Sequence, residues 1–172
     1  IEELSRRMKG DYSLVLLTKN GLIASRGWGR KPLILGKSED SYVVSSESCT
    51  FPNLNIEIER DVEPGEIVMI DEKGFKTLKQ LYLSPIKYGT FEWIYTANAS
   101  SVIDGVSVEK FRNIVGAKLA ERYPVDADLV SEIPNSGIGY AIGYSHKSNI
   151  RHSRIFVKYD YADRSFTQGT AA

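Results

Sequence analysis

The chain has 172 residues, of which 42% are apolar and 26% are charged, as in an ordinary soluble globular protein. Its 22 Lys and Arg balance 22 Asp and Glu, so no global electrostatic field attracts nucleic acid or an anionic membrane. No apolar run approaches the roughly 20 residues of a membrane helix, and the N-terminus has no signal-like apolar core. Because Cys49 is the only cysteine, an internal disulfide is excluded. We therefore expect a cytoplasmic protein that binds neither nucleic acid nor membranes.

The two ends of the sequence predict an incomplete chain. It begins at Ile1, within the charge pattern of a helix already under way and without an initiator Met. It ends in SFTQGTAA, with no closing element.

The first half predicts a run of short antiparallel strands. An Asn-Gly turn at residues 19–21 joins the first two strands as a hairpin, and residues 63–66 and 72–74 have turn composition. A glycine-rich loop follows the second strand. We expect this loop to have a structural role, with Trp28 as its anchor. The strands are expected at residues 11–18, 22–26, 33–36, 42–45, 56–61, 67–70 and 75–78.

The second half predicts alternating strands and helices. Residues 91–97 are expected to be a strand, and 98–104 are turn-rich. A helix is expected to begin at Val108, with Ser107 as its N-cap, and to stop before Pro124. Its apolar face is expected to consist of Val108, Phe111, Val115 and Leu119. A strand at 129–133, a helix at 138–148 and a strand at 153–159 complete the prediction.

Four segments carry a resemblance that extends over nearly the whole chain. They are SRGWGRKPLILG, VVSSESCTF, DVEPGEIVMIDEKG and FEWIYTANASSVIDGVSV. Together they resemble the glutamine phosphoribosylpyrophosphate amidotransferase (amidophosphoribosyltransferase) family. The family's version of the first segment is one residue longer and carries Asp-Pro after the arginine.

The resemblance implies two domains with different folds. Residues 1–88 would be the later part of an α+β N-terminal-nucleophile (Ntn) glutaminase domain, a four-layer sandwich. Residues 89–172 would be the early part of an α/β type I phosphoribosyltransferase domain with a parallel sheet. The mixed segment at residues 82–88, with Pro85 and then Gly89, marks the expected boundary.

The small polar loop Pro134, Asn135, Ser136 and Gly137 is a candidate anion site. A loop between a strand and a helix presents backbone N–H groups and a helix N-terminus, which suits a pyrophosphate. The same pattern is typical of an ordinary strand-to-helix turn capped by Asn135 or Ser136. The resemblance implies that this loop binds the pyrophosphate of phosphoribosylpyrophosphate, although the family usually has an acidic residue where Asn135 stands.

Lys158 and Arg164 are the second pair of candidate substrate-binding residues, because both side chains form charge-assisted contacts with phosphates. The resemblance implies that they help to close a flexible loop over the substrate. Asp160, Asp163 and Thr167 replace a basic residue, a glycine and an apolar residue of the family pattern. A solvated strand end with mixed charges remains an alternative.

We expect no catalytic or metal-binding residue in this chain. The family's nucleophile is an N-terminal cysteine, which is absent here, and no histidine lies near Cys49 in the sequence. His146 and His152 lack metal-ligand spacing and are expected at the surface. Some relatives hold an iron–sulfur cluster, but Gly89 and Thr90 occupy the place of its first cysteine and Cys49 cannot supply four thiolates.

The resemblance implies an Mg²⁺-dependent glycosyltransferase with glutaminase activity. The complete enzyme would use glutamine and phosphoribosylpyrophosphate to make 5-phosphoribosylamine, the first committed step of purine biosynthesis, as a homo-oligomer that responds to nucleotide effectors. The chain as it stands is expected to be inactive. One alternative is a non-catalytic nucleotide-sensing or interaction protein on the same scaffold. A weaker alternative is another amidotransferase that shares only the glutaminase domain.

Overall fold

The computed structural model describes residues 1–81 and 85–161. The chain consists of two compact units, and each is described by itself. The first is Ile1–Phe111, and the second begins at Arg112. The predicted domain boundary after residue 88 concerns the family's domains and stays a prediction. Among the described residues, no helix has the length and apolar character that crossing a membrane requires.

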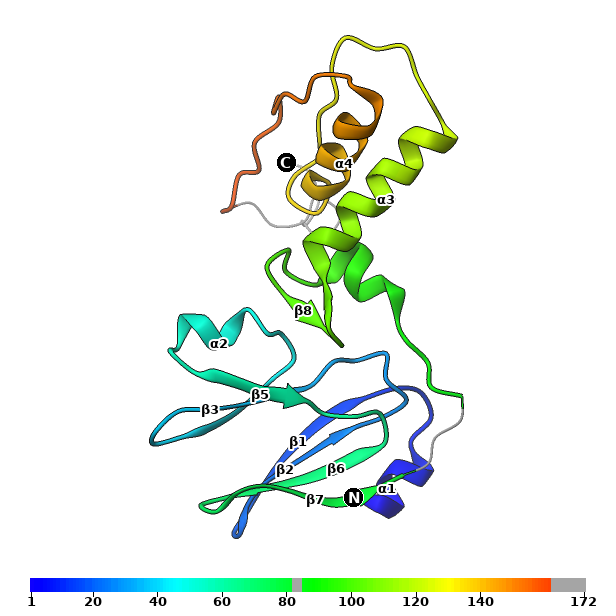
Figure 1. Cartoon of the computed structure of the whole chain (residues 1–172). Coiled ribbons are helices and arrows are strands. Elements are labelled where there is room, and N and C mark those ends of the chain that lie inside the picture. The colour runs from blue at the N-terminus through cyan, green and yellow to red at the C-terminus, as the bar shows by residue number, and fades with distance from the viewer. Residues whose placement is uncertain (82–84, 162–172) are drawn as a thin grey trace, which may run out of the picture. The chain divides into compact units, whose positions relative to one another are not determined.

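The first unit is built mainly from antiparallel strands (Figure 1). Its elements are α1 (Glu2–Arg7), β1 (Ser13–Thr18), β2 (Gly21–Arg26), β3 (Ile34–Lys37), β4 (Tyr42–Ser45), α2 (Thr50–Asn53), β5 (Glu57–Asp61), β6 (Glu66–Asp71), β7 (Gly74–Gln80), the π-helical turn η1 (Glu92–Thr96), β8 (Val102–Ile103) and β9 (Val106–Ser107).

The strands form a four-stranded sheet in the order β1-β2-β6-β7, a three-stranded sheet in the order β4-β3-β5, and the β8-β9 hairpin. A core of buried side chains packs the first two sheets together, because its members come from both. They are Ala24, Val68 and Ile70 from the larger sheet, Leu35 from the smaller sheet, and Leu33 and Val62 beside β3 and β5. The predicted strands of residues 11–78 are confirmed to within a few residues.

Residues 92–96 form the π-helical turn η1, with Ala97 as its C-cap, so the strand predicted at residues 91–97 is wrong. Trp93 and Ala97 are buried together with Ile103 and Val108, whereas Ile94 and Tyr95 between them are exposed. A strand would bury Tyr95 on the same face as Trp93 and Ala97, whereas burial at i and i+4 with i+2 exposed is the pattern of a helical turn. The Ala97 N–H donates to the Glu92 carbonyl at 3.0 Å and closes the turn.

The second unit contains α4 (Ile138–Ser148) and most of α3 (Val108–Arg122). The boundary between the two units lies inside α3. The Lys110 N–H donates to Ser107 Oγ at 3.3 Å, which confirms the predicted N-cap of α3. The predicted core face of α3 is confirmed for Val108 and Phe111, which pack in the core, and wrong for Val115 and Leu119, which are exposed. The buried face instead carries Val108, Arg112, Gly116 and Ala120.

Glycines explain this choice of face. A Cβ on Gly116 would lie 2.1 Å from the Tyr140 carbonyl oxygen of α4, and a Cβ on Gly143 would lie 2.0 Å from the Asn113 carbonyl oxygen of α3. Real Cβ atoms do not approach so closely, so the two helices pack backbone to backbone at these glycines.

The structure has no strand at residues 129–133 or 153–159, so these two strand predictions are wrong. A single parallel bridge joins Val130 of the first segment to His152, the residue that precedes the second. A strand extends only where a neighbour supplies backbone partners along its length, and here the bridge is limited to one residue pair. In the described part of the chain, this bridge is all that there is of the predicted parallel sheet.

Candidate functional site

The predicted anion loop forms a tight turn that leads directly into α4. The Gly137 N–H donates to the Ile133 carbonyl, and the Ile138 N–H donates to the Asn135 carbonyl, each at 3.2 Å. The peptide bond between Pro134 and Asn135 is cis. Gly137 is the N-cap of α4 and provides no side-chain hydrogen bond to the helix. The first turn of α4 therefore presents its amides, and the positive end of the helix dipole, without a side-chain cap.

Gly137 is the residue that this geometry requires. A Cβ at Gly137 would lie 2.5 Å from the Ile133 carbonyl oxygen and 3.1 Å from the Ile133 nitrogen. Both are backbone atoms, which cannot rotate away. The close-packed turn therefore depends on the absence of a Cβ at Gly137. That the loop binds pyrophosphate stays a prediction.

Glu132, which the sequence prediction missed, precedes the loop in the sequence and is separated from Pro134 by Ile133 alone. Its side chain is 1% exposed, and its two carboxylate oxygens lie 2.8 Å from His152 Nε2 and 3.6 Å from Arg154 Nε. The hydrogen bond from His152 holds the pKa of Glu132 below its usual value, against the effect of desolvation. One acidic residue within the apolar segment 129–133 is the signal that could have indicated it.

Lys158 is partly exposed, and its Nζ lies 3.4 Å from Asp160 Oδ1, whose side chain is 76% exposed. Asp160, which stands where the family pattern has a basic residue, therefore places a carboxylate beside the candidate phosphate-binding lysine. The predictions for Arg164, Asp163 and Thr167 lie outside the described residues.

A mainly apolar cavity of about 480 Å³ borders the loop at Ile133 and Gly137. The polar residues Glu132 and Tyr140, which flank Ile133 and Gly137 in the sequence, also line the cavity. Burial raises the pKa of Tyr140. The remaining lining residues are Leu119, Val125, Leu129, Val130, Ser131, Ala141 and Tyr144.

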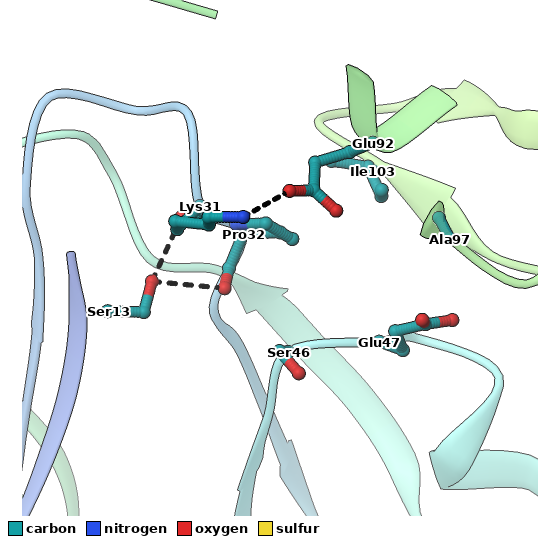
Figure 2. Close-up of a pocket in the computed structure, with 8 residues that line it drawn as sticks. All are labelled: Ser13, Lys31, Pro32, Ser46, Glu47, Glu92, Ala97 and Ile103. Carbon is teal, nitrogen blue, oxygen red and sulfur yellow. Dashed lines mark hydrogen bonds and ion pairs between the residues drawn. The ribbon is translucent and has the colours of Figure 1, made fainter. Parts of the chain in front are cut away.

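The first unit contains a smaller and more polar cavity of about 240 Å³ (Figure 2). Lys31 Nζ lies 2.7 Å from Glu92 Oε1 across it, as the dashed line in Figure 2 shows. Ser13 Oγ donates to the carbonyl oxygens of Lys31 and Pro32. Glu47 also lines the cavity, but its Oε2 accepts hydrogen bonds from Ser101 Oγ and the Asn98 N–H.

Arg26 is the largest fully buried side chain of the first unit. Its guanidinium forms a bidentate pair with Asp104, at 2.7 and 2.8 Å, and donates to the carbonyl oxygens of Gly29, Lys31 and Val62. Asp61 is near this pair, and its Oδ1 is buried without a hydrogen-bond partner among the described residues. Burial and the Asp104 carboxylate raise the pKa of Asp61.

The glycine-rich loop after β2 is ordered by Asp11, whose carboxylate accepts the N–H groups of Tyr12, Trp28 and Arg30. Lys87 Nζ lies 4.9 Å from the centre of the Trp28 ring. These contacts agree with the structural role predicted for Trp28.

Cys49 Sγ lies 3.5 Å from Glu47 Oε2. Within the described ranges, no three His, Cys, Asp or Glu residues gather in a way that could hold a metal ion.

Comparison with known proteins places the chain beside one group of enzymes. No family model matches it. Amidophosphoribosyltransferase from Methanocaldococcus jannaschii is 37% identical over 182 residues, which cover 96% of this chain and 39% of the relative. The Archaeoglobus fulgidus enzyme is 38% identical, covering 96% of the chain and 36% of the relative. A chloroplastic amidophosphoribosyltransferase from Vigna aconitifolia is 34% identical, covering 98% and 35%.

Solved structures agree with these relatives. One described as the allosteric regulatory enzyme of purine biosynthesis is 34% identical with a TM-score of 0.88, covering 98% of this chain and 36% of that one. The glutamine phosphoribosylpyrophosphate amidotransferase from B. subtilis, complexed with ADP and GMP, is 33% identical with a TM-score of 0.88, covering 98% and 37%. Over nearly its whole length the chain is thus similar to amidophosphoribosyltransferases, of whose length it spans somewhat more than a third.

Proposed function

We propose that the chain contributes to an amidophosphoribosyltransferase that makes 5-phosphoribosylamine from glutamine and phosphoribosylpyrophosphate, and that Pro134–Gly137 binds the pyrophosphate group. The observation that carries the proposal is the tight turn that opens α4 without a side-chain cap, in a chain similar to these enzymes. Backbone amides and a helix dipole favour a bound anion at such a turn. Glutaminase activity, oligomeric assembly and location in the cytoplasm remain predictions.

The chemistry proposed for this loop is stabilisation of a leaving group. When an amine displaces pyrophosphate from the ribose carbon, negative charge accumulates on the departing oxygens. The Ser136 hydroxyl, the Asn135 side-chain amide and the amides of the first turn of α4 that follow Ile138 would donate hydrogen bonds to those oxygens, and Lys158 would add a positive charge. No reorganisation is needed for the amides, because the fold already fixes their direction.

Magnesium would enter with the substrate in this proposal. The loop itself offers only neutral oxygen ligands, from Asn135 and Ser136, and the described residues form no carboxylate cage. Mg²⁺ commonly binds through substrate phosphates and water with few protein ligands, and it would supply further neutralisation of the phosphates. Binding and orientation by the chain's own groups are therefore the part that we propose here.

The test is the binding of phosphoribosylpyrophosphate and of inorganic pyrophosphate, measured by calorimetry with and without Mg²⁺. Ser136→Asp places a negative charge in the loop and is expected to weaken binding by at least about tenfold, which corresponds to about 1.4 kcal/mol. Ser41→Asp makes the same change in net charge at an exposed position of the first unit and should leave binding unchanged. Equal affinities of wild type and Ser136→Asp would contradict the proposed site.

A second candidate is a non-catalytic nucleotide-sensing protein on the same scaffold. The observation that favours it is the carboxylate of Asp160 beside Lys158, which offsets a charge that pyrophosphate would need. Under this alternative, the chain would bind nucleoside phosphates, while Asp160→Asn would not strengthen pyrophosphate binding. Under the enzyme proposal, Asp160→Asn should strengthen it.

A further inference from the structure

The buried carboxylate of Glu132 has partners on both of its oxygens. His152 Nε2 lies 2.8 Å from Oε2, and Arg154 Nε lies 3.6 Å from Oε1. A buried carboxylate without such partners would be strongly unfavourable, whereas here the partners compensate its desolvation. Because both partners come from residues 151–155, Glu132 joins two segments that are separate in the sequence.

The backbone joins the same two segments. The Val130 N–H donates to the Arg151 carbonyl at 2.9 Å, and the Ser153 N–H donates to the Val130 carbonyl at 3.0 Å. The Ile155 N–H donates to Ser131 Oγ at 3.2 Å. Residues 130–132 and 151–155 thus lie side by side, with the contacts of Glu132 to His152 and Arg154 at the end nearest the Pro134–Gly137 loop in sequence.

Each of the two joined segments leads into one of the candidate phosphate-binding groups. Pro134 follows shortly after Glu132, and Lys158 follows shortly after Arg154. We infer that Glu132 is a positioning residue, which fixes the segment carrying Lys158 against the root of the Pro134–Gly137 loop so that the two bind one pyrophosphate group together. This inference rests on the proposed function.

Glu132 is not proposed to touch the anion. Its carboxylate would repel phosphate oxygens, and its 1% exposed side chain is already occupied by His152 and Arg154. Its effect on binding must therefore pass through the relative placement of the loop and Lys158. A role of this kind predicts energetic coupling between Glu132 and Lys158, which a residue needed only for folding would not show.

The experiment is a double-mutant cycle on inorganic pyrophosphate binding by the whole chain, measured by calorimetry. The four proteins are wild type, Glu132→Gln, Lys158→Ala and the double variant. We expect each single substitution to weaken binding. We also expect the effect of Lys158→Ala to be at least about threefold smaller in the Glu132→Gln background, because the lysine is no longer held in place.

Glu121→Gln provides a matched control. Glu121 is a partly exposed glutamate of the same unit that also has two cationic partners, Lys118 at 2.8 Å and Lys147 at 2.9 Å. Both of these partners lie outside residues 130–132 and 151–155, so the effect of Glu121→Gln should add independently to that of Lys158→Ala. Circular dichroism establishes that each variant is folded. If Glu132→Gln does not fold, His152→Gln replaces it in the cycle, because that side chain is 30% exposed.

The outcomes separate this inference from the proposed function. Pyrophosphate binding by wild type with fully additive variants would overturn the coupling and leave the phosphate site intact. An absence of pyrophosphate binding by wild type would overturn the proposed phosphate site, and the inference with it.

Discussion

Single residues that the sequence prediction did not single out hold the first unit together. Arg26 and Asp104 are 78 positions apart in the sequence, yet they form a bidentate pair with the arginine side chain 1% exposed. Asp104 reaches it from the turn between β8 and β9, with a positive φ of 48°. No periodicity or turn signal connects such distant residues, so the pairing could be found only from the fold.

Removal of the Asp104 charge should destabilise the first unit strongly. Asp104→Asn removes the bidentate partner of the buried Arg26 guanidinium. Loss of one partner of a buried pair typically costs about 3 to 5 kcal/mol, and the nearby Asp61 carboxylate offsets part of this cost. Urea unfolding monitored by tryptophan fluorescence measures the change in the free energy of unfolding. Asp71→Asn, at the end of β6, has no arginine partner in the described structure and serves as the control. A loss below about 1 kcal/mol would show that water replaces the carboxylate.

Asp61 should respond in the opposite way. Burial and the nearby Asp104 raise its folded-state pKa above the usual value, so ionised Asp61 opposes folding at neutral pH. The contribution of its protonated form is fully present below the unfolded pKa and is lost as pH rises through the raised folded pKa. Asp61→Asn is therefore expected to leave stability unchanged or to increase it at pH 7, by the same urea unfolding. Strong destabilisation at pH 7 would show that the charge is needed.

At the scale of elements, local signals predicted the antiparallel strands of the first unit well. The turn at residues 19–21 closes the β1-β2 hairpin, in which Thr18 pairs with Gly21. The turns at 63–66 and 72–74 delimit β6. In contrast, residues 91–97 have an aromatic composition that suits strands, and tertiary packing of Trp93 and Ala97 overrides that preference.

The contact between α3 and α4 should be sensitive to a single methyl group. Gly143→Ala would place Cβ against the Asn113 carbonyl, and overpacking of this kind costs about 1 to 3 kcal/mol. The better helix propensity of alanine would contribute about 1 kcal/mol in the opposite direction. We expect the clash to prevail, because a backbone carbonyl cannot rotate away. Thermal unfolding followed by circular dichroism measures the result.

Lys110→Ala is the matched control for this change, because Lys110 is an exposed residue of α3. Its effect should stay within about 0.5 kcal/mol. A Gly143→Ala variant that is more stable than wild type would contradict the close approach of the two helices.

At the scale of the whole molecule, carboxylates with lowered pKa values should make the fold sensitive to acid. Burial raises the pKa of Glu66, but hydrogen bonds from Arg60 and Thr77 outweigh it, and the His152 hydrogen bond lowers the pKa of Glu132. A carboxylate whose folded pKa is depressed stabilises the fold above its unfolded pKa, near 4.5, and this contribution is lost as pH falls through the folded value.

Urea unfolding at a series of values from about pH 6 to pH 3 should therefore show falling stability below about pH 4.5. Glu66→Gln should reduce the slope in that range, since it removes one of the carboxylates whose pKa is lowered. An unchanged slope in Glu66→Gln would assign the acid sensitivity to other carboxylates.

The candidate site was only partly predictable from the sequence. The Pro134–Gly137 turn and the helix at 138–148 followed from small polar residues between two periodic segments, and the helix bounds match α4. The partners of Glu132 could not be predicted, because neither His152 nor Arg154 lies at a helical or strand spacing from Glu132. Their meeting depends on the bridge between Val130 and His152, which is a product of tertiary structure.

The carboxylate of Asp11 has a consequence for how the loop after β2 tolerates sequence change. It accepts the main-chain N–H groups of Trp28 and Arg30, which every residue except proline supplies. The path of the loop is therefore specified by one side chain outside it. A library randomised at residues 28 and 30 should retain this path for most substitutions, while Asp11→Ala should lose it in a loop of native sequence.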